Sequence, residues 1–123
     1  MIKEKIDILV GKYPRLFERI KHLECGDGWF SILDHLCAIL DDHCEYVGIS
    51  LVVEQIKEKF GDLRFYYSGG DEFCAGAVHM AEAMTAHVCE ICGNPGEINK
   101  EGYWLSCRCE KCRTEENKKK KID

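Results

Sequence analysis

The sequence predicts an α+β fold, with helices packed on a small antiparallel sheet and a small cysteine-bearing module at the C-terminus. Apolar residues recur every three or four positions over residues 29–45, which is typical of an amphipathic helix. Two β-prone runs follow at hairpin distance, and two Cys-x-x-Cys pairs stand near the end of the chain. A chain of 123 residues, 46% apolar and 32% charged, suits one compact body with an appendage.

The N-terminal part is predicted to be helical. Ile2, Ile6, Leu9 and Val10 form one helical stripe. Asp27, in a glycine-rich turn, is placed to cap a longer helix over residues 29–45. The apolar positions of this longer helix are Trp29, Phe30, Leu33, Leu36, Cys37, Leu40 and Cys44.

Residues 49–57 and 63–67 are predicted to form an antiparallel hairpin, because both are rich in β-branched, aliphatic and aromatic residues and a Phe-Gly-Asp break separates them. Alternation along the second strand places Leu63, Phe65 and Tyr67 on one face. A further helix is expected over residues 72–88, capped by Asp71. We expect it to bury a stripe of Phe73, Ala77, Met80, Met84 and Val88.

The strongest motif is a pair of Cys-x-x-Cys sequences, Cys89 with Cys92 and Cys109 with Cys112. Sixteen residues separate the two pairs, which is the spacing of a four-thiolate zinc site. Residues 96–98 and 103–105 are predicted to form two short strands that bring the pairs together. The sequence therefore predicts a Zn²⁺-binding zinc ribbon.

These motifs divide the chain into a helical and hairpin body over residues 1–88, a zinc-ribbon module over residues 89–112, and a charged, disordered tail over residues 113–123. Four thiolates leave no open position for a catalytic water, so the zinc is expected to be structural. A redox-active Cys-x-x-Cys pair is the main competing interpretation. Cys107 is an alternative ligand to Cys109, because it stands only two positions earlier.

The net charge of −5 is unevenly distributed. Residues 1–88 carry 9 basic and 15 acidic side chains, a balance of −6, and this argues against a large nucleic-acid footprint on the body. No apolar run approaches the roughly 20 residues of a membrane span, and the N-terminus lacks the apolar block of a signal peptide. We therefore expect a cytoplasmic protein that does not bind membranes.

Several segments together resemble a family of small phage, prophage and bacterial proteins. They are Gly26-Asp-Gly-Trp-Phe, the run from Ile56 to Tyr67 that contains Lys-Phe-Gly-Asp-Leu-Arg-Phe-Tyr, Cys89-Glu-Ile-Cys-Gly-Asn-Pro-Gly96, and Tyr103-Trp-Leu. The resemblance covers roughly residues 25–112. It implies a zinc-binding C-terminus in the cytoplasm of a bacterial cell or phage-infected host, and no particular activity. Cys107 departs from the family pattern.

No nucleophile, base and oxyanion donor assemble in the sequence, so we expect a protein that is not an enzyme. The favoured hypothesis is binding to a protein partner, as an inhibitor or modulator of a host system. Arginine and aromatic side chains are enriched in recognition patches, and candidates for such a surface are Arg64, Tyr66, Trp104 and Lys111.

The alternative hypothesis is a nucleic-acid-binding accessory protein that uses the C-terminal region. Its contacts would come from the basic side chains there, namely Lys100, Arg108, Lys111, Arg113 and Lys118 to Lys121.

Overall fold

The computed structural model describes residues 1–99 and 104–122, and within them the α+β class is confirmed. The body consists of α1 (Lys3–Lys12), β1 (His22–Glu24), a 3-10 turn η1 (Asp27–Trp29), α2 (Phe30–Val47), β2 (Leu51–Lys59), β3 (Asp62–Gly69) and α3 (Glu72–Thr85). The C-terminal module consists of β4 (Glu97–Ile98), β5 (Cys107–Arg108) and α4 (Glu110–Ile122). No helix of the described part is long and apolar enough to cross a membrane.

The main sheet has the order β1-β2-β3 and is mixed rather than antiparallel. The hairpin β2–β3 is antiparallel, as expected, but β1 pairs in parallel with β2. The parallel pair arises because the chain crosses from β1 to β2 through α2. β1 is only three residues long, too short to show a period of two in the sequence.

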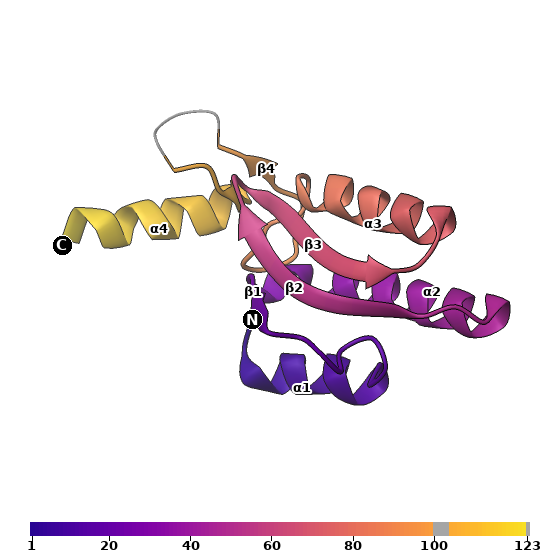
Figure 1. Cartoon of the computed structure of the whole chain (residues 1–123). Helices are drawn as coiled ribbons and strands as arrows, with labels where there is room; N and C mark the ends of the chain where they lie inside the picture. Colours follow the sequence, from indigo (N-terminus) through magenta and orange to yellow (C-terminus); the bar gives the residue numbers. More distant parts are fainter. Residues whose placement is uncertain (100–103, 123) are drawn as a thin grey trace.

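Helices α2 and α3 cover one face of the hairpin, and α1 lies beside α2 (Figure 1). A bulge after Val53 keeps both Val53 and Ile56 turned towards this helical layer, where both are fully buried. Leu63 and Phe65 of β3 are buried on the same face. The opposite face of β3 carries Arg64 and Tyr66, as the alternation predicts.

Helix α2 buries the stripe that its sequence predicts, including Leu33, Leu36 and Leu40. Asp27 does not cap it. The carboxylate of Asp27 instead accepts a hydrogen bond from the backbone N–H of Ile2 at 2.9 Å, which ties the N-terminus to the turn before α2.

Helix α3 contradicts the predicted buried stripe. Asp71 caps it as expected, accepting from the backbone N–H of Cys74 at 3.1 Å. However, the buried residues are Cys74, Val78, Ala81 and Thr85. Phe73, Met80 and Met84 are 53%, 63% and 49% exposed. Apolar residues occupy two faces of α3, and small side chains let the Cys74 face approach the sheet more closely, so apolar periodicity alone selects the wrong face.

Thr85 joins α3 to β3 through a buried hydroxyl. Its Oγ1 donates to the carbonyl of Glu82 at 2.7 Å and accepts from the backbone N–H of Leu63 at 3.0 Å.

Thr85→Val would leave the buried N–H of Leu63 without a partner, so we expect a loss of about 1–3 kcal/mol in the free energy of unfolding. Urea unfolding measures it. Thr114→Val, at an exposed position of α4, should change the free energy of unfolding by less than about 0.5 kcal/mol. If the two variants lose the same free energy of unfolding, the Thr85 hydroxyl does not stabilise the contact between α3 and β3.

The module differs from the sequence prediction in two places. Its second strand is Cys107–Arg108 and not residues 103–105; of those, Tyr103 lies outside the described residues and Trp104 is 76% exposed. Residues 113–122, expected to be a disordered tail, continue helix α4. Glutamate and lysine are good helix formers, and Glu115 precedes Lys119 by the favourable four positions.

Candidate metal centre

The four cysteines of the two Cys-x-x-Cys pairs converge at the module. The sulfur atoms of Cys89, Cys92, Cys109 and Cys112 all lie within 4.8 Å of one another. The Sγ atoms of Cys92 and Cys109 are 3.6 Å apart. Tetrahedral coordination with Zn–S bonds of about 2.3 Å places neighbouring sulfurs about 3.8 Å apart, so the cluster fits one zinc ion.

The first pair is shaped by a tight turn. The backbone N–H of Gly93 donates to the carbonyl of Cys89 at 2.9 Å, and Gly93 has a φ of +82°, a conformation that favours glycine. A second backbone bond, from the N–H of Cys89 to the carbonyl of Asn94 at 2.7 Å, closes the loop. Both sulfurs of the pair therefore face the same point.

The second pair stands at the beginning of α4. Cys109 immediately precedes the helix, and Cys112 lies in its first turn. The backbone N–H of Cys112 donates to the Sγ atom of Cys109 at 3.4 Å. The partial positive charge of a helix N-terminus favours thiolate at this place.

The pKa values of the cysteine thiols indicate that the cluster needs a bound cation to ionise fully. Burial opposes ionisation of Cys89, but backbone N–H groups directed at its sulfur lower the pKa of the thiol to about 7. Burial and hydrogen bonds with the neighbouring sulfurs raise the pKa of Cys112. One thiolate therefore suppresses ionisation of the others, and a divalent cation is what allows all four sulfurs to become ligands.

Cys107 lies outside the cluster. It is fully buried on β5, and its Sγ atom is 3.1 Å from the carbonyl oxygen of Val88 and 3.4 Å from those of Thr85 and Ala86. Its thiol donates into the end of α3, so the structure places Cys109, and not Cys107, with the other three sulfurs.

The first cysteine pair is docked on the turn that precedes α2. The carbonyl of Glu90 accepts from the backbone N–H of Gly28 at 2.7 Å, and its carboxylate accepts from the N–H of Gly26 at 2.8 Å. The indole N–H of the fully buried Trp29 donates to the carbonyl of Val88 at 2.8 Å. The Gly-Asp-Gly-Trp segment thus holds the metal-binding loop against the body through these hydrogen bonds.

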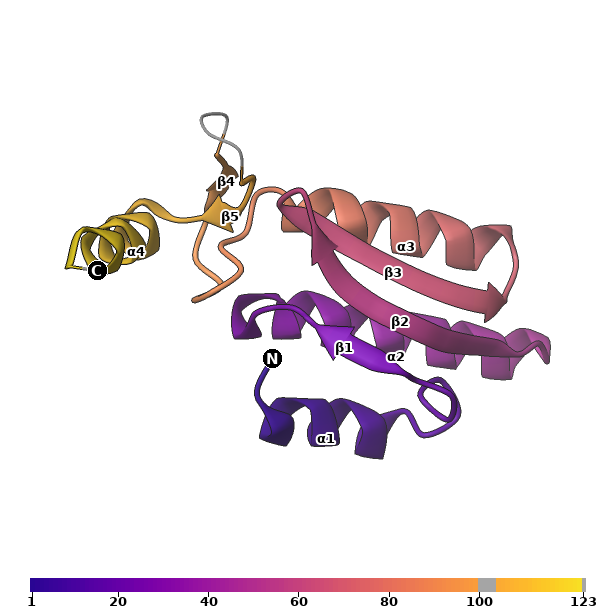
Figure 2. The same ribbon diagram turned by 60° about the vertical axis from the view of Figure 1, so that its left-hand side comes forward.

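Arg108, on β5, stabilises this contact between the metal-binding loop and the turn before α2. Its guanidinium contacts Glu90 at 3.1 Å and Glu116 of α4 at 3.3 Å, and the Arg108 and Glu90 side chains are only 13% and 11% exposed. Arg108 and Glu90 therefore form a mostly buried ion pair, and the partly exposed Glu116 extends it to α4. Figure 2 shows the module at one end of the body, with α4 projecting away from it.

The residues proposed as a binding surface fall into two places. Arg64 and Tyr66 lie on the open face of the sheet, where Arg64 pairs with Asp62 at 3.2 Å and Lys57 lies over the Tyr66 ring at 5.9 Å. Trp104 and Lys111 are exposed in the module. Lys100, from the nucleic-acid hypothesis, lies outside the described residues.

Sequence reasoning missed a groove on the outer side of the helical layer. It has a volume of about 420 Å³ and lies between α2 and α3. Its lining is mostly apolar and consists of Ser31, Ile32, His35, Leu36, Ile39, Ala77, Met80, Ala81 and Met84. A second apolar stripe on α3, beyond the one that the sheet can cover, was the signal in the sequence.

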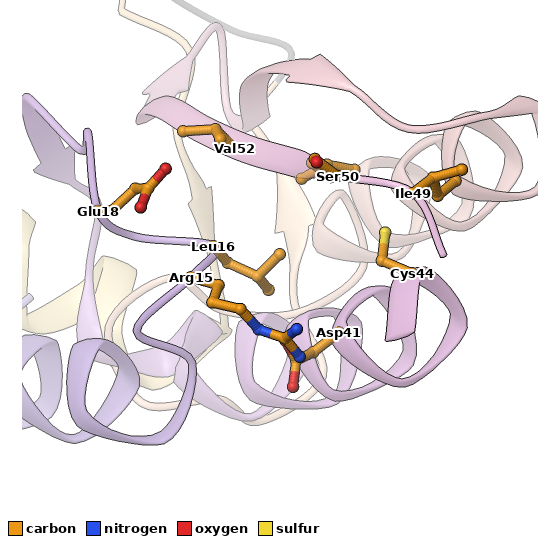
Figure 3. A pocket seen from close by; sticks show the side chains of 9 residues that line it. Arg15, Leu16, Glu18, Asp41, Cys44, Ile49, Ser50 and Val52 are labelled. Atoms are coloured by element: carbon orange, nitrogen blue, oxygen red, sulfur yellow. The ribbon is translucent and has the colours of Figure 1, made fainter. Parts of the chain in front are cut away.

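A smaller depression of about 180 Å³ lies where the chain after α1 meets α2 and the start of β2 (Figure 3). Arg15 points across it towards Asp41, at 3.5 Å. Cys44 borders the same depression. Because Arg15, the one basic residue in its lining, is already paired with Asp41, the depression offers no free cation for an anionic ligand.

Comparisons with family models, with curated proteins and with solved structures give no match for this chain. The four-cysteine cluster and the groove are therefore interpreted on their own geometry.

Proposed function

We propose that this chain is a binding protein without catalytic activity, whose C-terminal module is stabilised by structural zinc. It binds an apolar helical segment of a protein partner in the groove between α2 and α3. The motif resemblance described above supports a phage or bacterial setting, in which such a protein would inhibit or modulate a host system. The groove carries the proposal, and the zinc centre holds the end of α3 in place.

The zinc centre supports binding rather than catalysis. Four cysteine sulfurs complete a tetrahedral shell, and no position remains for a water molecule or substrate. The surrounding contacts are structural: Cys107 donates into the end of α3, and Glu90 joins the metal loop to the turn before α2. The metal thus fixes one end of the helical layer that forms the groove.

The exposed face of α3 supports an apolar partner. Met80 and Met84 protrude from it, and Ile39 on α2 is 48% exposed across the groove. Contiguous exposed apolar patches on soluble domains mark interaction sites. Methionine is common on such surfaces because its flexible side chain adapts to a partner's shape.

Charge indicates which partner fits. Helices α2 and α3 together carry six carboxylates and no lysine or arginine. Asp34 and Asp41 are paired with Lys12 and Arg15, but Asp42, one turn after Ile39 on α2, is exposed. A helix with an apolar stripe flanked by lysine or arginine therefore complements the groove, whereas a second acidic copy of this chain does not.

Methionine NMR tests this proposal, because the chain has three methionines, of which Met80 and Met84 line the groove and Met1 does not. The probe is an amphipathic helical peptide of leucine and lysine. We expect it to shift the methyl signals of Met80 and Met84 saturably and to leave that of Met1 unchanged. A scrambled peptide of the same composition, and a leucine–glutamate helix, should leave all three methionine signals unchanged.

Ile39→Asp places a charge in the groove without disturbing the core, because this side chain is half exposed. It should weaken binding of the leucine–lysine peptide at least about tenfold, the loss of roughly 1.4 kcal/mol. Equal shifts with the scrambled peptide, or undiminished binding by Ile39→Asp, would contradict the proposal. Shifts of Met80 and Met84 that depend on protein concentration alone would identify a second copy as the occupant instead.

The nucleic-acid alternative has less support, because both arginines of the module are engaged within the protein, although Lys111, Lys118 and Lys119 are exposed. Arg108 is paired with Glu90 and Glu116, and Arg113 donates to the carbonyls of Glu97 and Ser106, each at 3.1 Å. Phosphate binding would have to break these contacts.

A further inference from the structure

A second group of metal-binding side chains lies at the far end of the helical layer. Helix α3 (Glu72–Thr85) follows its cap, Asp71, and ends shortly before the zinc loop, so its N-terminus is a whole helix away from the four-cysteine centre. At this N-terminus the donor atoms of His43, Asp71 and Cys74 all lie within 4.8 Å of one another. The Sγ atom of Cys44 is 4.0 Å from that of Cys74.

We propose that His43, Asp71 and Cys74, with Cys44 as the fourth donor, form a second site for a thiophilic transition-metal ion such as zinc. The site is independent of the four-cysteine centre. It would tie the C-terminal end of α2 to the N-terminal end of α3, and so close the helical layer at its other end.

The distances suit one ion. Nε2 of His43 is 2.8 Å from Oδ2 of Asp71, and the donor atoms of His43, Asp71 and Cys74 all lie within 4.8 Å of one another. The Cys44 sulfur is 4.0 Å from that of Cys74, close to the spacing of about 3.8 Å between thiolates on tetrahedral zinc. It is not within 4.8 Å of all three other donors, so the Cys44 side chain would turn towards the ion as it binds. An ion would take the place of the proton shared by His43 and Asp71, and of the thiol protons of the two cysteines.

The donor set is one that zinc prefers. Imidazole and thiolate are its commonest protein ligands, and a carboxylate often completes such a site. Capping and ion pairing explain part of the cluster, since Oδ1 of Asp71 accepts from the N–H of Cys74. They do not explain why two thiols meet beside the His43–Asp71 pair.

The donors are held in place before any ion arrives. The ring of His43 stacks on Phe73, with the ring centroids 4.1 Å apart, and Asp71 is fixed by its cap. The Asp71 and His43 side chains are 41% and 19% exposed, and Cys44 borders the depression of Figure 3. An ion can therefore reach the site from solvent, whereas Cys74 is fully buried.

The test is a cobalt titration of the 123-residue chain that already holds zinc at its first site, followed by native mass spectrometry. We expect a second equivalent to bind, with sulfur-to-cobalt charge-transfer absorption. Cys74→Ser should abolish both the second equivalent and this absorption, while retaining the first zinc. His43→Gln, a change near the surface, should also lose the second equivalent.

His79→Gln is the matched control, because this exposed histidine lies on α3 outside the cluster; it should retain both metals. Circular dichroism establishes that each variant is folded. The proposal is overturned if the wild type binds only one metal ion under excess cobalt, or if the second equivalent persists in both Cys74→Ser and His43→Gln.

Discussion

Cys112→Ser is expected to lose the module's zinc and to lower the melting temperature by more than about 10 °C. Removing one of four thiolates opens the shell, and structural zinc contributes about 10–16 kcal/mol of apparent binding free energy in small zinc-dependent folds. Part of the loss reaches the body, because Glu90 of the metal loop bonds to Gly26 and Gly28. Metal analysis and thermal unfolding followed by circular dichroism measure the two effects.

Lys111→Ser is the matched control. Lys111 is the exposed neighbour of Cys112, so this substitution removes only a surface charge. It should keep its zinc and change stability by no more than about 0.5 kcal/mol. If Cys112→Ser unfolds at the same temperature as the wild type, the zinc centre does not hold the fold together.

Gly28→Ala is expected to destabilise the protein by about 3 kcal/mol or more, although it adds a single methyl group. A Cβ atom at Gly28 would lie 2.1 Å from the carbonyl oxygen of Cys89 and 2.6 Å from the backbone nitrogen of Gly93. Both are backbone atoms of the metal loop, so neither can move aside without distorting the ligand geometry. Urea unfolding gives the change in free energy, and the zinc content should fall with it.

Gly11→Ala provides the comparison, because nothing lies within 4 Å of a Cβ atom there. Gly11 is in the last turn of α1, where alanine is the better helix former, so this variant should be neutral or more stable by up to about 1 kcal/mol. A Gly28→Ala protein as stable as Gly11→Ala would show that the turn before α2 is not the seat of the metal loop.

Strong local patterns made the helices of the body, the hairpin and the cysteine pairs predictable, whereas α4 was not predicted. The two Cys-x-x-Cys pairs define a site through spacing alone, and α2 has an apolar stripe that matches its buried face. Alternation in β3 assigned Leu63 and Phe65 to the core correctly.

The parts that failed depend on contacts between distant segments. Nothing near His22 reveals that it will pair with Gln55 in a parallel ladder. The prediction of the buried face of α3 was wrong, because the small side chains of Cys74 and Ala81 pack on the sheet and Met80 is left outside. The groove arises from that choice, because the second apolar stripe of α3 is left outside the sheet.

The role of the Gly-Asp-Gly-Trp turn was likewise hidden. Its glycines suggested a turn before a helix, and Asp27 suggested a cap. In the structure, Gly26 and Gly28 are needed because the backbone of Glu90 and Cys89 passes directly against them. Contacts across more than sixty residues of chain leave no periodic trace in a single sequence.

Native mass spectrometry with metal analysis of the wild type, Cys109→Ser and Cys107→Ser, each purified without added zinc, tests the central claim most directly. The structure predicts that Cys109→Ser carries one zinc ion fewer than the wild type, whereas Cys107→Ser carries the same number. The reason is that the Cys107 thiol is directed at carbonyls at the end of α3 and just after it, and not at the cluster. An unchanged zinc count in Cys109→Ser, or a disulfide between these cysteines in place of zinc, would contradict it.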